Sequence, residues 1–65
     1  MIRIYGKAKG AKRFKPFDYK EGCFVGNIIY ATLWPISAQS YVDTLVEALN
    51  SMNVGYIFES RIIKF

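Results

Sequence analysis

The sequence predicts a small α+β fold: a mostly antiparallel sheet of three or four strands with a single helix packed on one face, in the order β-β-α-β. Two observations predict it. Apolar residues alternate with a period of two before residue 36 and after residue 53, whereas between residues 38 and 52 they recur at helical spacing. The chain has 65 residues and no visible repeat or linker, so we expect one domain over residues 1–65.

The first third of the chain is expected to form a bent hairpin arm. Residues 1–5 alternate as a short strand, and residues 6–13 then have no apolar period. Residues 12–19 regain aromatic side chains around Pro16, which cannot donate a ladder hydrogen bond and therefore favours a sheet edge or an irregular segment. Residues 20–22 are expected to form a tight turn into the next strand.

Residues 22–35, Gly-Cys-Phe-Val-Gly-Asn-Ile-Ile-Tyr-Ala-Thr-Leu-Trp-Pro, are expected to form one long strand around which the rest is organised. Both of its sides are mostly apolar, with β-branched and aromatic residues throughout. Such a strand needs two covering layers, and one helix supplies only one, so an apolar face should remain for a second copy of the chain, most simply as a dimer, or for a protein partner. The sequence does not decide which side faces the helix. The candidate interaction surface is Phe24, Ile28, Tyr30 and Trp34.

Residues 38–52 are expected to form the helix, because their apolar residues fall on one stripe. Ser37 is a candidate N-cap, with Ser40 as a second, capping-box-like start. Asn53 can take the left-handed conformation that commonly ends a helix. The stripe consists of Ala38, Tyr41, Val42, Leu45, Ala48, Leu49 and Met52.

Residues 54–65 alternate again and are expected to form the last strand. A right-handed crossover through the helix would make this strand parallel to the long one, with the first strand either between them or beside them. The side expected to face the core carries Val54, Tyr56, Phe58, Ser60 and Ile62, with Lys64.

Positive charge is concentrated at the start of the chain. The net charge is +4, but residues 1–22 carry a net +5 and residues 23–65 a net −1. Cations interleaved with aromatic residues suit a nucleic acid, since phosphates bind the cations and unpaired bases stack on the rings. A basic segment can equally keep a small apolar protein soluble, and the sequence favours neither interpretation. The candidate nucleic-acid-binding residues are Lys7, Lys9, Lys12, Arg13 and Lys15.

The sequence lacks the usual residues of a catalytic or metal site. It has no histidine, and its single cysteine can form neither an internal disulfide nor a zinc site. We expect Cys23 to be a buried apolar filler rather than a nucleophile, and Glu59 and Arg61 to form an ion pair along one strand. Residues 6–13 do not have the glycine spacing of a phosphate-binding Walker loop. We therefore expect no enzyme activity, no catalytic residue, no metal, no cofactor and no small-molecule substrate.

The sequence favours a cytoplasmic protein with a reduced thiol and no membrane association. The longest apolar run covers about 12 residues and is interrupted by polar ones, whereas a spanning helix needs about 20. The start of the chain has no apolar signal core, so no signal peptide is expected.

Residues 9–16, Lys-Gly-Ala-Lys-Arg-Phe-Lys-Pro, followed by residues 24–34, Phe-Val-Gly-Asn-Ile-Ile-Tyr-Ala-Thr-Leu-Trp, resemble a pattern in short bacterial proteins of unknown function. The similarity covers most of the N-terminal half. It implies a bacterial origin and an accessory or mobile-element setting, and it brings no catalytic or binding residue with it.

Our leading hypothesis is a small non-enzymatic binding module that contacts a nucleic-acid backbone through its basic N-terminal segment. The alternative is a protein-interaction or self-assembling module that uses an exposed aromatic sheet face, with the lysines serving only solubility.

Overall fold

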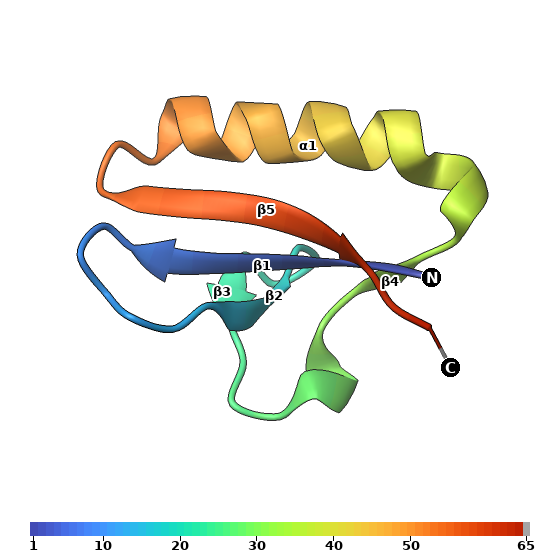
Figure 1. Ribbon diagram of the computed structural model, residues 1–65, viewed down its shortest axis with the longest axis horizontal. Helices are drawn as coiled ribbons and strands as arrows, with labels where there is room; N and C mark the ends of the chain where they lie inside the picture. Colours follow the sequence, from blue (N-terminus) through green and yellow to red (C-terminus); the bar gives the residue numbers. More distant parts are fainter. Residues whose placement is uncertain (65) are drawn as a thin grey trace.

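The computed structural model of the protein describes residues 1–64. It confirms the α+β class, with an antiparallel sheet and a single helix, and Figure 1 shows these elements. In chain order the elements are β1 (Ile2–Ala8), β2 (Lys15–Asp18), β3 (Cys23–Phe24), the 3-10 turn η1 (Ile28–Tyr30), β4 (Leu33–Trp34), the 3-10 turn η2 (Ile36–Ala38), α1 (Gln39–Met52) and β5 (Tyr56–Ile62).

The first strand, β1, is the centre of the sheet. It pairs along its whole length with β5, which occupies one of its edges. The other edge is shared, because β4 pairs with Ile2 and Arg3 and β2 pairs with Tyr5 and Gly6. β3 continues the sheet beyond β2. Since β4 and β5 are both antiparallel to β1, they run parallel to each other with β1 between them, which is one of the two crossover arrangements expected.

The hydrophobic core lies between this sheet and α1. Ile2 and Ile4 of β1 are completely or almost completely removed from solvent, and burying side chains of this size contributes about 1.5–3 kcal/mol each. They pack with Phe58 of β5 and with Val42 and Leu45 of α1. Figure 1 shows α1 along one side of the sheet and η1 on the other.

The other face of the sheet, here called the outer face, carries the alternate residues of β1. These are Arg3, Tyr5 and Lys7, since Ile2 and Ile4 point into the core. The register places three residues of β5 opposite them on the same face, namely Arg61, Glu59 and Ile57. Arg3 and Tyr5 are buried too, although they do not belong to the cluster of residues that packs against α1.

The prediction of one long strand over residues 22–35 is wrong. The chain is extended only at β3 and β4, which pair with different neighbours, and η1 lies between them. Asn27 Oδ1 accepts a hydrogen bond from Ile29 N, which gives the backbone a partner inside η1 in place of a sheet neighbour. Thr32 Oγ1 accepts from Tyr19 N and ties the returning segment to the β2–β3 turn. The order β-β-α-β is therefore wrong as well, since four short or medium strands precede the helix.

The helix prediction is confirmed, since α1 covers Gln39–Met52 and the expected range was 38–52. Val42 and Leu45 of the predicted stripe are buried. The rest of the stripe lies at its margins: Ala38 and Leu49 pack partly against the core, and Tyr41, Ala48 and Met52 are exposed.

Several local predictions differ from the structure. Cys23 is exposed in β3, so it is not a buried filler. Neither Ser37 nor Ser40 caps α1, because η2 leads directly into the helix and Ala38 occupies the cap position without a side-chain bond. Asn53 ends α1 at φ −120°, outside the left-handed region, and its side chain donates to a carbonyl of the last turn instead.

The last strand is shorter than the predicted 54–65 range, and Phe65 lies outside the described residues. Of the side expected to face the core, Phe58 is buried, whereas Tyr56 and Ile62 near the strand ends are exposed.

The hairpin arm predicted for the first third is confirmed. β1 and β2 are antiparallel neighbours, and the loop between them turns at Gly10, whose φ of +88° lies in the region that favours glycine. The turn predicted at residues 20–22 is present too, with Gly22 N donating to Asp18 O at 2.8 Å.

Gly6 allows two aromatic rings to pack closely against β1. Phe24 and Phe58 stack with ring centroids 5.9 Å apart over this position. A Cβ added to Gly6 would lie 2.7 Å from Phe58 Cδ1 and 2.8 Å from Phe24 Cε1, so both rings would have to move.

Gly6→Ala is therefore expected to lower the free energy of unfolding by about 1–3 kcal/mol, the usual cost of overpacking a core. Chemical denaturation measures it. Gly26→Ala is the matched control, because a Cβ there meets nothing within 4 Å, and its effect should stay below about 1 kcal/mol. Equal effects of the two substitutions would show that the aromatic stack does not constrain Gly6.

The free edge of β5 is closed by a side chain of the helix. Asn50 Nδ2 donates to Phe58 O at 3.1 Å, and Asn50 Oδ1 accepts from Phe58 N at 2.7 Å. One amide thus satisfies both outward backbone groups of Phe58, as a neighbouring strand would, and protects an edge that could otherwise pair with another chain.

Asn50→Ala is expected to cost about 1–3 kcal/mol of stability, because both backbone groups of Phe58 lose their partner. Asn50→Asp should cost at least as much, because its carboxylate still accepts from Phe58 N but cannot donate to Phe58 O, which repels it. Thermal denaturation of both variants, with the exposed Ser51→Ala as control, measures the ranking. A loss in Asn50→Ala no larger than in the control would contradict this role.

Candidate nucleic-acid interface

The five predicted nucleic-acid-binding residues all lie on the β1–β2 hairpin, which we call the basic hairpin (residues 7–15). Lys7 is half-buried at the end of β1, Lys15 is exposed at the start of β2, and the other three are exposed in the loop between them. By strand parity Lys7 points to the outer face, whereas Lys15, opposite Gly6, points to the other. The cations therefore surround the tip of the hairpin rather than forming one flat patch. The loop residues are Lys9, Lys12 and Arg13.

The basic hairpin has no carboxylate of its own. No Asp or Glu precedes Asp18 in the sequence. Asp18 Oδ1 is occupied by the N–H groups of Lys20 and Glu21 and by the Thr32 hydroxyl. Within residues 1–64 the ion pair between side chains is that of Arg61 and Glu59 on β5, as predicted, and none involves the hairpin. Its positive charge thus remains uncompensated.

Phe14 links the basic hairpin to the outer face of the sheet. Lys7 Nζ lies 4.8 Å from the centroid of its ring, and the guanidinium carbon of Arg61 lies 5.0 Å from it. The same Arg61 group lies 4.4 Å from the ring centroid of Tyr5. Cation–π contacts of this kind are worth about 0.5–1 kcal/mol each at exposed sites, so the aromatic rings help to fix two cations without neutralising them.

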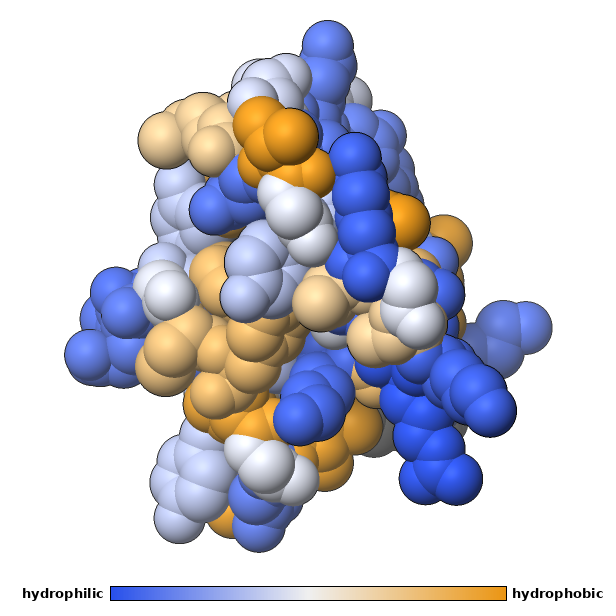
Figure 2. Space-filling view, turned by 90° about the vertical axis from the view of Figure 1, so that its left-hand side faces the viewer, coloured by the Kyte–Doolittle hydropathy of each residue, from blue (hydrophilic) through white to orange (hydrophobic). Residues whose placement is uncertain are grey.

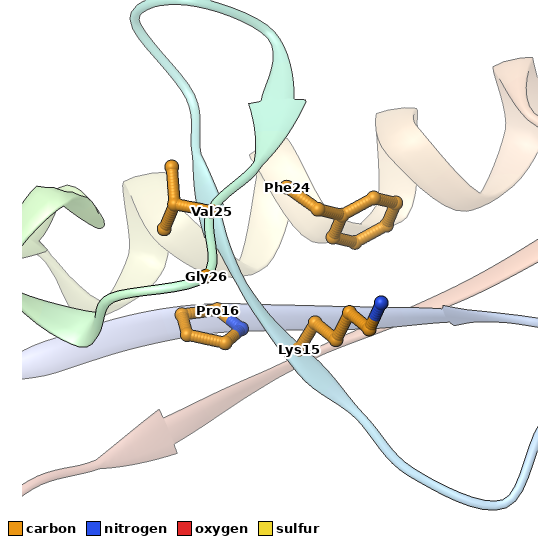
Figure 3. Close-up of a pocket in the computed structure, with 5 residues that line it drawn as sticks. All are labelled: Lys15, Pro16, Phe24, Val25 and Gly26. Atoms are coloured by element: carbon orange, nitrogen blue, oxygen red, sulfur yellow. The ribbon is translucent and has the colours of Figure 1, made fainter.

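A hollow of about 220 Å³ lies at the other side of the hairpin. Figure 3 shows that the Lys15 side chain extends beside the ring of Phe24, with Pro16, Val25 and Gly26 lining the rest. The hollow therefore combines apolar walls with one cation.

Figure 2 views the end of the molecule where the β1–β2 loop and the α1–β5 turn lie. Hydrophilic side chains project on the right and at the left edge of this view, and apolar surface is visible between them, at the upper centre, left of centre and towards the bottom. Hydrophilic and apolar groups are thus interspersed at this end.

The four residues predicted as an interaction surface do not share one face, because the long strand that would have aligned them is absent. Phe24 and Trp34 are half-buried and pack against the core. Ile28 and Tyr30 are exposed on η1. A role of these residues in an interaction stays a prediction. Between residues 28 and 36 the large apolar residues that the structure exposes are Ile28, Ile29, Tyr30, Leu33 and Ile36.

Sequence reasoning missed the two arginines of the outer face, Arg3 and Arg61. The register pairs them directly across β1 and β5. Each could be placed on a strand from its alternation, but the pairing of the first strand with the last is a contact over the whole chain. No local sequence pattern predicts the pairing of the first strand with the last.

The chain matches no protein-family model, no curated protein and no solved structure, so the resemblance to short bacterial proteins of unknown function stays a prediction. The described residues contain no helix with the length and apolar character that crossing a membrane requires. Nor do residues 1–64 bring three or more potential metal-ligating side chains together.

Proposed function

We propose that this protein is a small, non-enzymatic binding module that contacts a nucleic-acid backbone through the basic hairpin. The observation that supports it most is the gathering of five cations on one hairpin without an acidic partner. Lysine and arginine side chains in this state release counterions from a phosphate backbone when they bind it, which drives association without sequence specificity.

The arrangement of the cations suits a backbone better than a single small anion. Three of them occupy a loop that turns at Gly10, and the other two flank it on opposite faces of the hairpin. A chain of phosphates can follow such a tip, whereas one anion reaches only part of it. The solubility interpretation predicts no such preference, because it requires only that the charges face water.

Affinity for short DNA or RNA should fall steeply with salt. If all five cations contact phosphates of a duplex, affinity should fall roughly 500-fold between about 50 and 200 mM salt. Fluorescence anisotropy with single- and double-stranded DNA and RNA measures the slope. Absence of binding at about 50 mM salt would remove this function.

Two double variants locate the contact. Lys12→Gln with Arg13→Gln should reduce the logarithmic salt slope by about 2, since two phosphate contacts are lost. Lys20→Gln with Lys64→Gln removes the same charge outside the basic hairpin and should leave the slope nearly unchanged. Equal slopes for the two variants would place the contact elsewhere on the surface.

A second candidate function, self-association or protein binding, is favoured by the exposed apolar residues around η1. Ile29 and Tyr30 are 73% and 65% exposed, and Leu33 and Ile36 lie exposed nearby in the chain. Surfaces of this kind commonly become covered by another protein. The basic hairpin would then serve mainly to keep the unassembled chain soluble.

Light scattering at micromolar concentration tests this candidate. The protein should form a dimer or larger assembly, and Ile29→Ser with Tyr30→Ser should convert it to a monomer. Met52→Ser is the control, since Met52 is equally exposed but lies at the end of α1. A clean monomer before any substitution would exclude self-association.

A further inference from the structure

Arg3 is the most unusual charged residue of the structure. Its side chain is buried, with 6% of the residue exposed, on the outer face of β1. Its only side-chain hydrogen bond within residues 1–64 runs from Nη1 to the Tyr5 hydroxyl at 3.2 Å, and its buried Nε has no partner there. A guanidinium group remains charged at any physiological pH, and leaving a buried charge without a counter-ion costs several kcal/mol.

A second arginine lies directly opposite the first across the sheet. Arg61 is the cross-strand neighbour of Arg3, and residues that face each other in this way have their Cβ atoms about 4.5–5.5 Å apart. Both groups touch Tyr5, Arg3 at its hydroxyl and Arg61 over its ring. Like charges directly opposite each other in a sheet are destabilising, so this pair is not explained by the stability of the sheet.

The outer face supplies one carboxylate for three cations. Glu59 accepts a hydrogen bond from Arg61 Nε, and Arg3 and Lys7 form no ion pair within residues 1–64. Lys7 is held near Arg61 because both contact the ring of Phe14. The face thus keeps a net positive charge of two, and the buried Nε of Arg3 has no acceptor within residues 1–64.

We propose that the outer face of the sheet is a binding site for one phosphate group, which the guanidinium groups of Arg3 and Arg61 hold between them. A phosphate has several oxygens and can accept from both planar guanidinium forks at once, and such charge-assisted bonds are about twice as strong as neutral ones. Tyr5 positions the two forks. Lys7 adds a third cation at the rim towards the basic hairpin.

This inference deepens the proposed function, on which it rests for the source of the phosphate. A nucleic-acid strand that follows the basic hairpin would pass Lys7 and Phe14 and reach the outer face, where one backbone phosphate would occupy the site. The same chemistry accepts free inorganic phosphate, so the experiment separates the two sources.

The first measurement uses inorganic phosphate alone. In nuclear magnetic resonance spectra of the ¹⁵N-labelled protein, the Nε–H signals of Arg3 and Arg61 and the amide of Tyr5 should shift saturably with sodium phosphate. Sodium chloride at equal ionic strength should leave them in place. Equal shifts in both salts, or shifts confined to Lys12 and Arg13, would overturn the site.

The second measurement uses a single-stranded oligothymidylate and two variants that break the same ion pair with opposite effects on charge. Arg61→Gln should weaken binding about tenfold, because it removes one fork of the site. Glu59→Gln should strengthen binding about two- to threefold, because it releases Arg61 from its competing carboxylate. Both residues are partly solvent-exposed, so neither substitution should prevent folding.

The outcomes distinguish the two proposals. If both substitutions change the affinity for the oligonucleotide in the same direction, the effect comes from losing the ion pair between Arg61 and Glu59. This result would overturn the phosphate site and leave the hairpin proposal intact. Saturable phosphate shifts with no oligonucleotide binding would support the site with free phosphate as its source, while the proposed function would fail. Affinity changes of opposite sign in the two variants, together with saturable phosphate shifts, would support both the phosphate site and the proposed function.

Discussion

The pairing of β1 on both of its edges is the constraint on which the rest of the structure depends. β5 covers one edge over the full strand, and β2 and β4 divide the other between them. Five consecutive residues of this strand, 2–6, are buried, although one helix covers the described sheet. Ile2 and Ile4 anchor the core on one face, and Arg3 and Tyr5 are enclosed on the other.

This constraint connects the fold to the candidate sites. Because side chains alternate along β1, burying the two isoleucines under α1 necessarily directs Arg3, Tyr5 and Lys7 to the outer face. A hydrophobic residue at position 3 would satisfy the packing at lower electrostatic cost, since buried ionic groups can often be replaced by apolar ones without loss of stability. An arginine there is consistent with a surface that is completed by an anion rather than by the chain itself.

The sequence predicts those parts of the fold that depend on near neighbours. The 3.6-residue period locates α1 through Val42 and Leu45, and the glycines locate the turns at Gly10 and Gly22. The prediction of one strand over residues 22–35 is wrong because the β-branched and aromatic residues of this segment favour a strand locally. Its actual path depends on distant partners, since Phe24 pairs with β2 and Trp34 pairs with β1. The candidate site divides in the same way. The cations of the basic hairpin can be counted from the sequence, but the juxtaposition of Arg3 with Arg61 follows only from a register that joins the two ends of the chain.

The distribution of acidic residues explains how both charged regions remain available in so small a protein. Asp43 bonds to Gln39 within α1, Glu59 pairs with Arg61, and Asp18 is used by the backbone of its own turn. Each of these carboxylates has a local partner, so none of them reaches the basic hairpin. The apolar residues around η1 belong to a different segment again, and a surface there can be covered without hiding the hairpin. The proposed phosphate site is different, because Leu33 of β4 lies directly opposite Arg3 across the sheet, so association through the apolar residues would take place beside that site.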